Sequence, residues 1–201
     1  ILILFLYLFL KNGKLIFLDF RTIIFNIVSI LTGTGYISGE YDKWGSFPLF
    51  YFLILMFIGG CAGSTTCGIK IFRVQILYKF VINQLKRFIY PRGIFVIKYE
   101  NNTVNDKFLA SIISFIFLYI IIFFILTALL SITGLEFIIS ISGAATSISN
   151  VGPGLGSEIG SNGNFSKIPD ISKWILSIGM ILGRLELFTI LILFLPSFWR
   201  Q

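Results

Sequence analysis

The longest uninterrupted apolar run covers residues 108–132, FLASIISFIFLYIIIFFILTALLSI, and contains no charged residue. About 20 such residues carry an α-helix across the hydrocarbon core of a bilayer. The run therefore predicts a membrane-spanning helix. Residues 47–58 and 171–195 are also mainly apolar. The chain opens inside a further apolar run, residues 1–10, which is too short to span a bilayer, and we interpret it as the tail of a longer helix.

The apolar segments are arranged as two copies of one unit. Each unit has an apolar segment, a shorter apolar segment with a carboxylate near its start, a glycine-broken end, a polar stretch and another apolar segment. The spacing from Asp19 to Gly35 equals the spacing from Glu136 to Gly152. This pattern indicates an internal repeat of helix, short helix, loop and helix.

The short segments, residues 15–31 and 135–149, predict half-length helices that enter the membrane without crossing it. Non-helical backbone at membrane depth is tolerated only where it lines water or is buried in protein. The sequences that follow, TGTGY at 32–36 and SNVGPG at 149–154, should therefore line an aqueous path. Glycine allows positive φ, so successive carbonyls can turn toward one axis, and rings of carbonyls form cation filters.

The carboxylates of the two units have two interpretations. Asp19 and Glu136 lie near the N-terminal ends of the predicted short helices, where the helix dipole stabilises a negative charge. We favour this role in helix stability, and a role as ion ligands stays open.

Composition and charge support a membrane protein and give it an orientation. The chain is 56% hydrophobic and 12% charged, whereas soluble domains have about 25% charged residues. The net charge is +7, and seven basic residues, with no Asp or Glu, lie between residues 70 and 98. The positive-inside rule predicts that this connection is cytoplasmic and that 36–46 and 153–170 are external. Such a basic segment favours anionic lipid or a cytosolic partner over nucleic acid.

Other classes of function have little support in the residues. The chain has no His, and Cys61 and Cys67 alone cannot form a four-ligand zinc site. We interpret them as small buried thiols, with a disulfide as the alternative. No nucleophile–base pair is visible, so we do not predict an enzyme. A Na⁺- or H⁺-coupled secondary transporter, such as a symporter with discontinuous helices, is the alternative function, although its usual inverted repeats do not match two parallel units.

Two interruptions of apolar segments carry candidate chemistry. Residues 58–70, IGGCAGSTTCGIK, break a helix with glycines, and their hydroxyl groups can satisfy the freed backbone groups. Lys70 belongs either to this loop or to the basic cytoplasmic segment. Arg184 and Glu186 interrupt the last apolar run, where a charge is costly and suggests function. Arg184 acts either near the pore or in assembly, and Glu186 is expected to contact a neighbouring helix.

The motifs TGTGY, IGGCAGSTTCGIKIFRV, SNVGPGLG and IGMILGRLELFTILILFLPSFWR, in this order, resemble the C-terminal half of the TrkH/TrkG/KtrB family of potassium transport subunits. The resemblance implies an all-α membrane fold of four helix–pore-loop–helix repeats around one pore, as in a potassium channel. Residues 1–98, with a truncated start, would be repeat three, including a gating loop at 59–69 and the basic cytoplasmic connection. Residues 99–201 would be repeat four.

The resemblance also implies partners and a location. Repeats one and two would be missing from this chain, two copies would form a homodimer, and a cytosolic nucleotide-binding subunit like TrkA or KtrA would regulate transport. The location would be the bacterial inner membrane, crossed several times and in contact with lipid. No cofactor is expected beyond K⁺ as the transported ion, and no nucleic acid.

The resemblance assigns roles to particular residues. One filter strand in each repeat would centre on Gly35 or Gly152, with K⁺ bound at Gly33, Thr34, Asn150 and Val151. The implied filter comprises Thr32, Gly33, Thr34, Gly35, Asn150, Val151 and Gly152. The implied gate comprises Gly59, Gly60, Cys61, Ala62, Gly63, Ser64, Thr65, Thr66, Gly68, Lys70 and Arg184. The family more often has a threonine at the position of Gly33, and glycines at the positions of Thr66 and Cys67, so this loop is expected to be stiffer.

Overall fold

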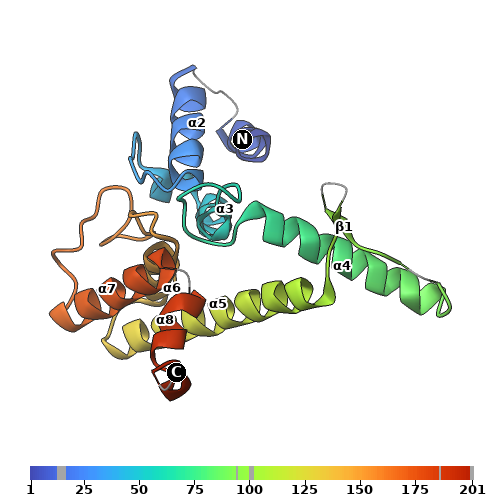
Figure 1. Cartoon of the computed structure of the whole chain (residues 1–201). Coiled ribbons are helices and arrows are strands. Elements are labelled where there is room, and N and C mark those ends of the chain that lie inside the picture. The colour runs from blue at the N-terminus through green and yellow to red at the C-terminus, as the bar shows by residue number, and fades with distance from the viewer. Residues whose placement is uncertain (13–16, 94, 100–101, 186, 200–201) are drawn as a thin grey trace.

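The computed structural model describes residues 1–12, 17–93, 95–99, 102–185 and 187–199. Within these residues the fold is almost entirely helical, as predicted (Figure 1). The first half contains α1 (Leu2–Asn12), α2 (Phe17–Leu31), the 3₁₀ helix η1 (Tyr41–Trp44), α3 (Ser46–Phe57) and α4 (Ile71–Ile89). The second half contains β1 (Lys98–Tyr99), β2 (Asn102–Thr103), α5 (Asp106–Ile132), α6 (Phe137–Ser149), α7 (Asp170–Arg184), α8 (Leu187–Leu193) and η2 (Pro196–Phe198).

Helix α5 confirms the long helix predicted from the apolar run at 108–132. It has 27 residues, and in the described parts of the chain it is the one helix that is long and apolar enough to cross a bilayer by itself. Asn105 caps its start, because the Asn105 side chain accepts a hydrogen bond from the Lys107 N–H at 3.4 Å. Many of its apolar side chains, such as Phe117 and Phe124, face outward as a lipid environment permits.

The last apolar run is not the single continuous helix that we expected. It forms α7 and α8, whose axes differ in direction by 106° across a short break. The break follows Arg184, which lies in the last turn of α7, where the helix dipole stabilises a positive charge. Arg184 therefore marks the end of one helix. Glu186 itself lies outside the described residues.

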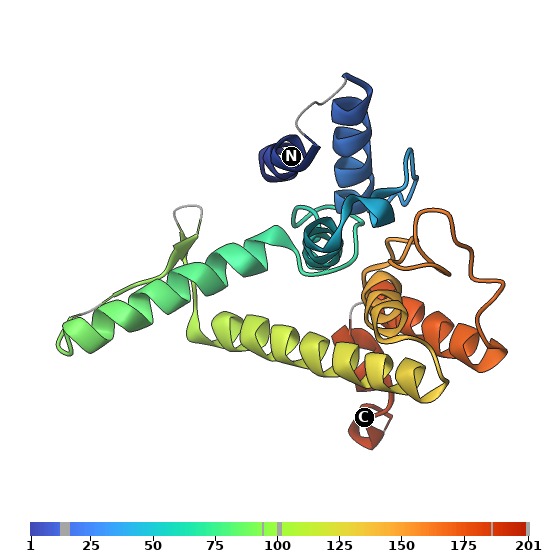
Figure 2. The ribbon, with the colours of Figure 1, turned by 180° about the vertical axis from the view of Figure 1, so that it is seen from behind.

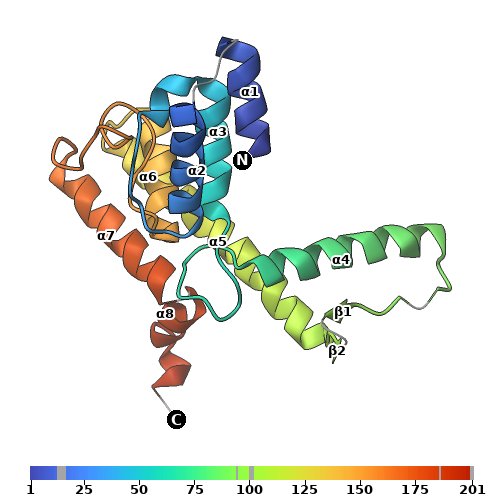
Figure 3. The same cartoon turned by 90° about the horizontal axis from the view of Figure 1, so that it is seen from above.

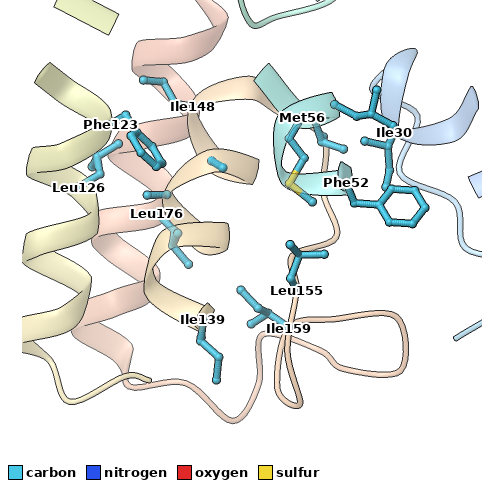
Figure 4. Close-up of a cluster of buried hydrophobic side chains, with 14 of the residues drawn as sticks. Ile30, Phe52, Met56, Phe123, Leu126, Ile139, Ile148, Leu155, Ile159 and Leu176 are labelled. Atoms are coloured by element: carbon cyan, nitrogen blue, oxygen red, sulfur yellow. The ribbon is translucent and has the colours of Figure 1, made fainter. Parts of the chain in front are cut away.

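Helix α6 is the centre of the packed core. Every residue from Ile139 to Ser149 except Ile141 is buried, and α6 packs against α5, α7 and α3. Figure 4 shows Ile148 of α6, Leu126 of α5 and Leu176 of α7 as members of one cluster of buried side chains. On the other side, Phe52 and Met56 of α3 approach the segment after α6 (Figure 4). The short helix of the second unit is thus enclosed by protein.

Two glycines on α7 allow it to approach the end of α6 closely. A Cβ added at Gly183 would lie 1.9 Å from the Ile148 carbonyl oxygen, and one added at Gly179 would lie 2.7 Å from Ser147 Oγ. Small residues four apart on one helix face are a common means of close helix packing in membranes. The GMILG sequence of α7 therefore fixes its position against α6.

Helix α4 leaves this core. Figures 1 and 2 show α4 and the first half of α5 extending from the packed helices, with the β1–β2 hairpin beside them. Ile76 of α4 packs with Leu109 and Ile112 of α5 in a second, small cluster. The strands pair in antiparallel register, with Lys98 opposite Thr103. The repeat boundary that we predict at 98/99 falls inside β1 and stays a prediction.

Candidate ion pathway

The first glycine segment, residues 32–36, folds back on the C-terminal end of α2. The N–H groups of Thr34 and Gly35 both donate to the Ser29 carbonyl, at 3.0 and 3.4 Å. The Thr32 hydroxyl donates to the Val28 carbonyl at 2.7 Å. Gly33 and Gly35 have φ values of +68° and +73°, a conformation that glycine adopts without steric cost. The hydroxyl of Thr32, which we considered as an ion ligand, is therefore bonded to the helix.

The second glycine segment, residues 150–154, folds back on the end of α6 in the same way. The Val151 N–H donates to the Thr146 carbonyl at 3.1 Å, and the Gly152 N–H donates to Thr146 Oγ1 at 2.9 Å. Asn150 ends α6 with φ +52°, and its side-chain Nδ2 donates to the Met180 carbonyl of α7 at 3.0 Å. Gly152 has φ +109°.

The two glycine segments lie against each other. A Cβ added at Gly35 would lie 2.4 Å from the Val151 carbonyl oxygen, and one added at Gly152 would lie 3.9 Å from Gly35 Cα. Within the described residues, no backbone N–H donates to a carbonyl of 32–35 or 150–152. Because no backbone N–H in the described parts of the chain donates to them, the carbonyls of these segments remain available to a ligand.

The interrupting loop, residues 58–70, lies between α3 and α4, where the sequence predicts non-helical backbone. Its ends are joined, because the Gly59 N–H donates to the Ile69 carbonyl and the Ile69 N–H donates to the Phe57 carbonyl, both at 2.9 Å. Inside the loop, Thr66 Oγ1 accepts from the Gly60 N–H at 3.0 Å. The loop also approaches the first glycine segment, since a Cβ added at Gly33 would lie 3.8 Å from Thr66 Cγ2.

Arg184 contacts the interrupting loop directly. Its Nη1 donates to the Thr65 carbonyl at 2.9 Å and lies 3.9 Å from Cys67 Sγ. Lys70 Nζ donates to the Ala62 carbonyl at 3.4 Å, so Lys70 also contacts the loop while it precedes the first turn of α4. A cavity of about 250 Å³ lies here, lined by Ser64, Thr65, Thr66, Cys67, Gly68, Lys70, Arg73, Phe115, Tyr119, Gly183, Arg184 and Leu187.

Sequence reasoning missed several residues that hold this arrangement. Ser29 and Thr146 anchor the two glycine segments, and the repeat could have revealed them, because Ser29 precedes Gly35 by the same interval as Thr146 precedes Gly152. Tyr119 of α5 shares a buried hydrogen bond of 2.8 Å with Ser149 Oγ. This long-range contact has no local signal in the sequence.

Arg73 of α4 was also missed as a cavity residue. Its guanidinium lies 3.8 Å from the centre of the Phe115 ring of α5, in a cation–π arrangement. In the sequence, Arg73 is one of the seven basic residues of the connection at 70–98, and nothing nearby signals its contact with α5.

The predictions for the carboxylates and the cysteines can be compared with the positions of these residues in the structure. Glu136 precedes the first turn of α6 and is exposed, at the helix end where it was predicted. Asp19 lies in α2, but its side chain is outside the described residues. Cys61 and Cys67 are free thiols, and Cys61 is exposed, so the expectation of two buried thiols was wrong. The irregular loop backbone around Cys61 does not enclose its side chain.

The loops that follow the two glycine segments also contact each other. The Tyr41 hydroxyl donates to the Gly154 carbonyl at 3.0 Å, and burial raises the pKa of Tyr41. Asp42 accepts hydrogen bonds from the Gly156 N–H at 3.4 Å and the Ser161 N–H at 2.5 Å. η1 is thereby attached to the segment that follows Gly152.

Replacing Asp42 by alanine is expected to weaken this attachment. Two backbone donors would lose a charged acceptor, and hydrogen bonds to charged groups contribute about 1.5–3 kcal/mol. The melting temperature of the purified full-length protein should fall, whereas Lys167→Ala, a change at an exposed residue in the loop that follows Gly152, should leave it unchanged. Equal melting temperatures for both variants would show that the Asp42 contacts do not stabilise the fold.

A model of the TrkH family, described as a cation transport protein, matches residues 18–201. The chain belongs to the TrkH family. Membership and helix α5 together identify it as a membrane protein.

TrkH-family proteins of known name and structure are similar to this chain. The Trk system potassium uptake protein TrkI of Halomonas elongata is 42% identical over 191 residues, covering 95% of this chain and 39% of that protein. TrkH of Escherichia coli K12 is 34% identical over 180 residues, covering 88% of this chain and 36% of that protein. The crystal structure of the potassium transporter TrkH from Vibrio parahaemolyticus matches with a TM-score of 0.88 and 34% identity, over 98% of this chain and 42% of that one. The chain thus spans about two fifths of the length of these relatives.

Proposed function

We propose that this chain forms part of a pathway for potassium ions across the bacterial inner membrane, with the two glycine segments as half of a selectivity filter. The observation that carries the proposal is the contact between segments from two separate units, at Gly35 and Gly152. Within the described residues, no backbone N–H donates to the carbonyls of these segments. Carbonyl rings replace the water shell of a cation in such filters. The potassium uptake proteins that the chain resembles support K⁺ as the ion.

The helices that precede the segments favour a cation as well. Both α2 and α6 end where a glycine segment begins, so their C-terminal ends point at the proposed filter. The C-terminal end of a helix carries a partial negative charge. We infer that Gly33, Thr34, Asn150 and Val151 contribute the carbonyls that bind K⁺, and that Thr32, Gly35 and Gly152 shape the strands.

We infer that the interrupting loop gates this path. The loop lies beside Gly33 and is held by Arg184 at Thr65. Its glycines permit non-helical backbone, and its hydroxyl groups satisfy the backbone that is freed. Arg184 therefore serves as a latch that keeps the loop under the filter.

Replacing Arg184 by alanine should raise the basal flux of K⁺ through the full-length protein in vesicles. The change removes a charge-assisted hydrogen bond of about 1.5 kcal/mol. This loss corresponds to roughly a tenfold shift of the equilibrium from the closed toward the open loop. Arg184→Lys keeps the charge but loses the planar donor, so it should raise the flux as well if the bond to Thr65 is the latch. Normal flux from properly assembled Arg184→Ala protein would contradict the latch and favour a role in assembly.

The remaining proposals concern the whole protein. We propose that other repeats complete the filter, that two copies pair as a homodimer, and that a cytosolic nucleotide-binding subunit acts on the loop. We propose neither a cofactor, nor a nucleic-acid partner, nor an enzymatic activity. Uptake of radioactive rubidium by vesicles containing the full-length protein tests the function, because excess K⁺ should suppress it and excess Na⁺ should not. Uptake driven only by a Na⁺ or H⁺ gradient would favour the coupled secondary transporter instead.

A further inference from the structure

Helix α4 has two apolar faces, and the described parts of the chain cover only one of them. The inner face packs on α5 through Ile76, which is fully buried. The opposite face carries a second series at alternating spacings of three and four residues, and each of its side chains is more than a third exposed. We call this series the outer stripe: Ile71, Val74, Tyr78, Val81, Leu85 and Phe88.

The outer stripe is most exposed at the end of α4. The exposed fraction is 38% at Ile71, 68% at Tyr78, 47% at Val81 and 84% at Phe88. Ile89 and Tyr90, which follow, are also largely exposed. Figure 3 shows that this end of α4 stands away from α2, α3 and α6. A continuous series of exposed aromatic and aliphatic side chains is typical of a surface that lies against lipid or another protein.

The charges around the outer stripe are of one sign. Residues 70–98 contain seven Lys or Arg and no carboxylate. Lys86 and Arg92 are exposed near Phe88. Arg87 differs, because it lines a hollow toward α5 together with Asp106. The end of the outer stripe is therefore flanked by positive charge that the helix itself does not balance.

We propose that the outer stripe lies in the cytoplasmic leaflet and selects anionic phospholipid. Its apolar side chains would enter the boundary between acyl chains and headgroups, as amphipathic helices do, with Tyr78 and Tyr90 at the interface. Lys86 and Arg92 would meet lipid phosphates, since basic residues are attracted to anionic leaflets. The positive-inside rule places this segment on the cytoplasmic side.

Charge decides between lipid and a second copy of this chain. The three-and-four spacing would also suit a partner helix. A symmetric pairing through the outer stripe, however, would bring two equally basic segments together without any carboxylate, and like charges repel. An anionic leaflet satisfies both the apolar stripe and its charges.

Spin labels on the full-length protein test this placement. Cys61 and Cys67 are replaced by serine, and a label is attached at Phe88→Cys in vesicles of phosphatidylcholine with or without phosphatidylglycerol. Matched labels at Phe124→Cys on α5 and Asn102→Cys on β2 provide lipid-facing and hairpin references. The measurement is the ratio of label accessibility to oxygen and to a water-soluble nickel chelate.

With phosphatidylglycerol, the Phe88 label should show the high oxygen preference of the Phe124 label. Pure phosphatidylcholine, or the variant Lys86→Glu with Arg92→Glu, should shift its ratio toward that of Asn102. A ratio like that of Asn102 in both lipids would overturn the proposal, as would a ratio that ignores lipid charge. Strong label–label broadening would assign the outer stripe to a second copy, and protection from both reagents would assign it to another protein segment; either result also overturns the proposal.

Discussion

Serine at position 152 is expected to reduce the preference of the full-length protein for K⁺ over Na⁺ by at least about tenfold. Gly152 has φ +109°, a conformation that L-residues rarely adopt. Holding a non-glycine residue there costs of order 1–3 kcal/mol, and about 1.4 kcal/mol corresponds to a factor of ten. The strained backbone should rotate and turn the Val151 carbonyl out of position, because the first glycine segment lies directly beside it. The measurement is the flux ratio of K⁺ to Na⁺ in vesicles.

Ala110→Ser is the matched control for Gly152→Ser. Ala110 is exposed near the start of α5, far along the chain from both glycine segments, so a serine side chain there should leave the flux ratio unchanged. If Gly152→Ser protein reaches the membrane in normal amount and keeps the wild-type ratio, the carbonyls beside Gly152 do not select the ion.

The second large effect is expected at Gly183, where alanine should destabilise the packing of α7 on α6. The added Cβ would lie 1.9 Å from the Ile148 carbonyl oxygen, and this atom belongs to backbone that cannot rotate away. Overpacking of this kind costs typically 1–3 kcal/mol. The displacement should also break the bond from Asn150 Nδ2 to Met180 and so disturb the second glycine segment. The melting temperature should fall, and ion selectivity should fall with it.

Gly143→Ala offers a closely matched control. Gly143 is also buried in a helix, but its added Cβ would make ordinary contacts of 3.4–3.6 Å with Ile159, Leu130 and Leu176. Alanine is the better helix former by about 1 kcal/mol, so this variant should be as stable as the wild type or more stable. A Gly183→Ala protein that melts like Gly143→Ala would show that α7 and α6 are not closely packed at this point.

The parts of the pathway that the sequence predicts are those specified locally. The short helices, the glycine segments and the interrupting loop each depend on a few neighbouring residues, and the equal spacing from Asp19 to Gly35 and from Glu136 to Gly152 relates the two units. The same repeat relates Ser29 to Thr146, and both anchor their segments. The length of α5 was predictable because a charge-free apolar run of this length forms one helix across the bilayer.

The contacts between distant segments could not be predicted in this way. The bond between Arg184 and Thr65 depends on where α7 packs, and Gly179 and Gly183 set that position against α6. The change of helix direction after Arg184 was not predicted, because the hydropathy of the last run is also that of one continuous helix. The outer stripe of α4 was hidden for a similar reason, since only the structure shows which of its two apolar faces is covered.

The central claim is that the carbonyls of the two glycine segments bind the transported ion. A crystal structure of the full-length protein grown in Rb⁺ or Tl⁺ tests it most directly, because the anomalous signal of these K⁺ substitutes locates the ion. We predict ion density beside the carbonyls of Gly33, Thr34, Asn150 and Val151, and its loss when Na⁺ replaces these ions. Density at Asp19 or Glu136, with none between the glycine segments, would contradict the account.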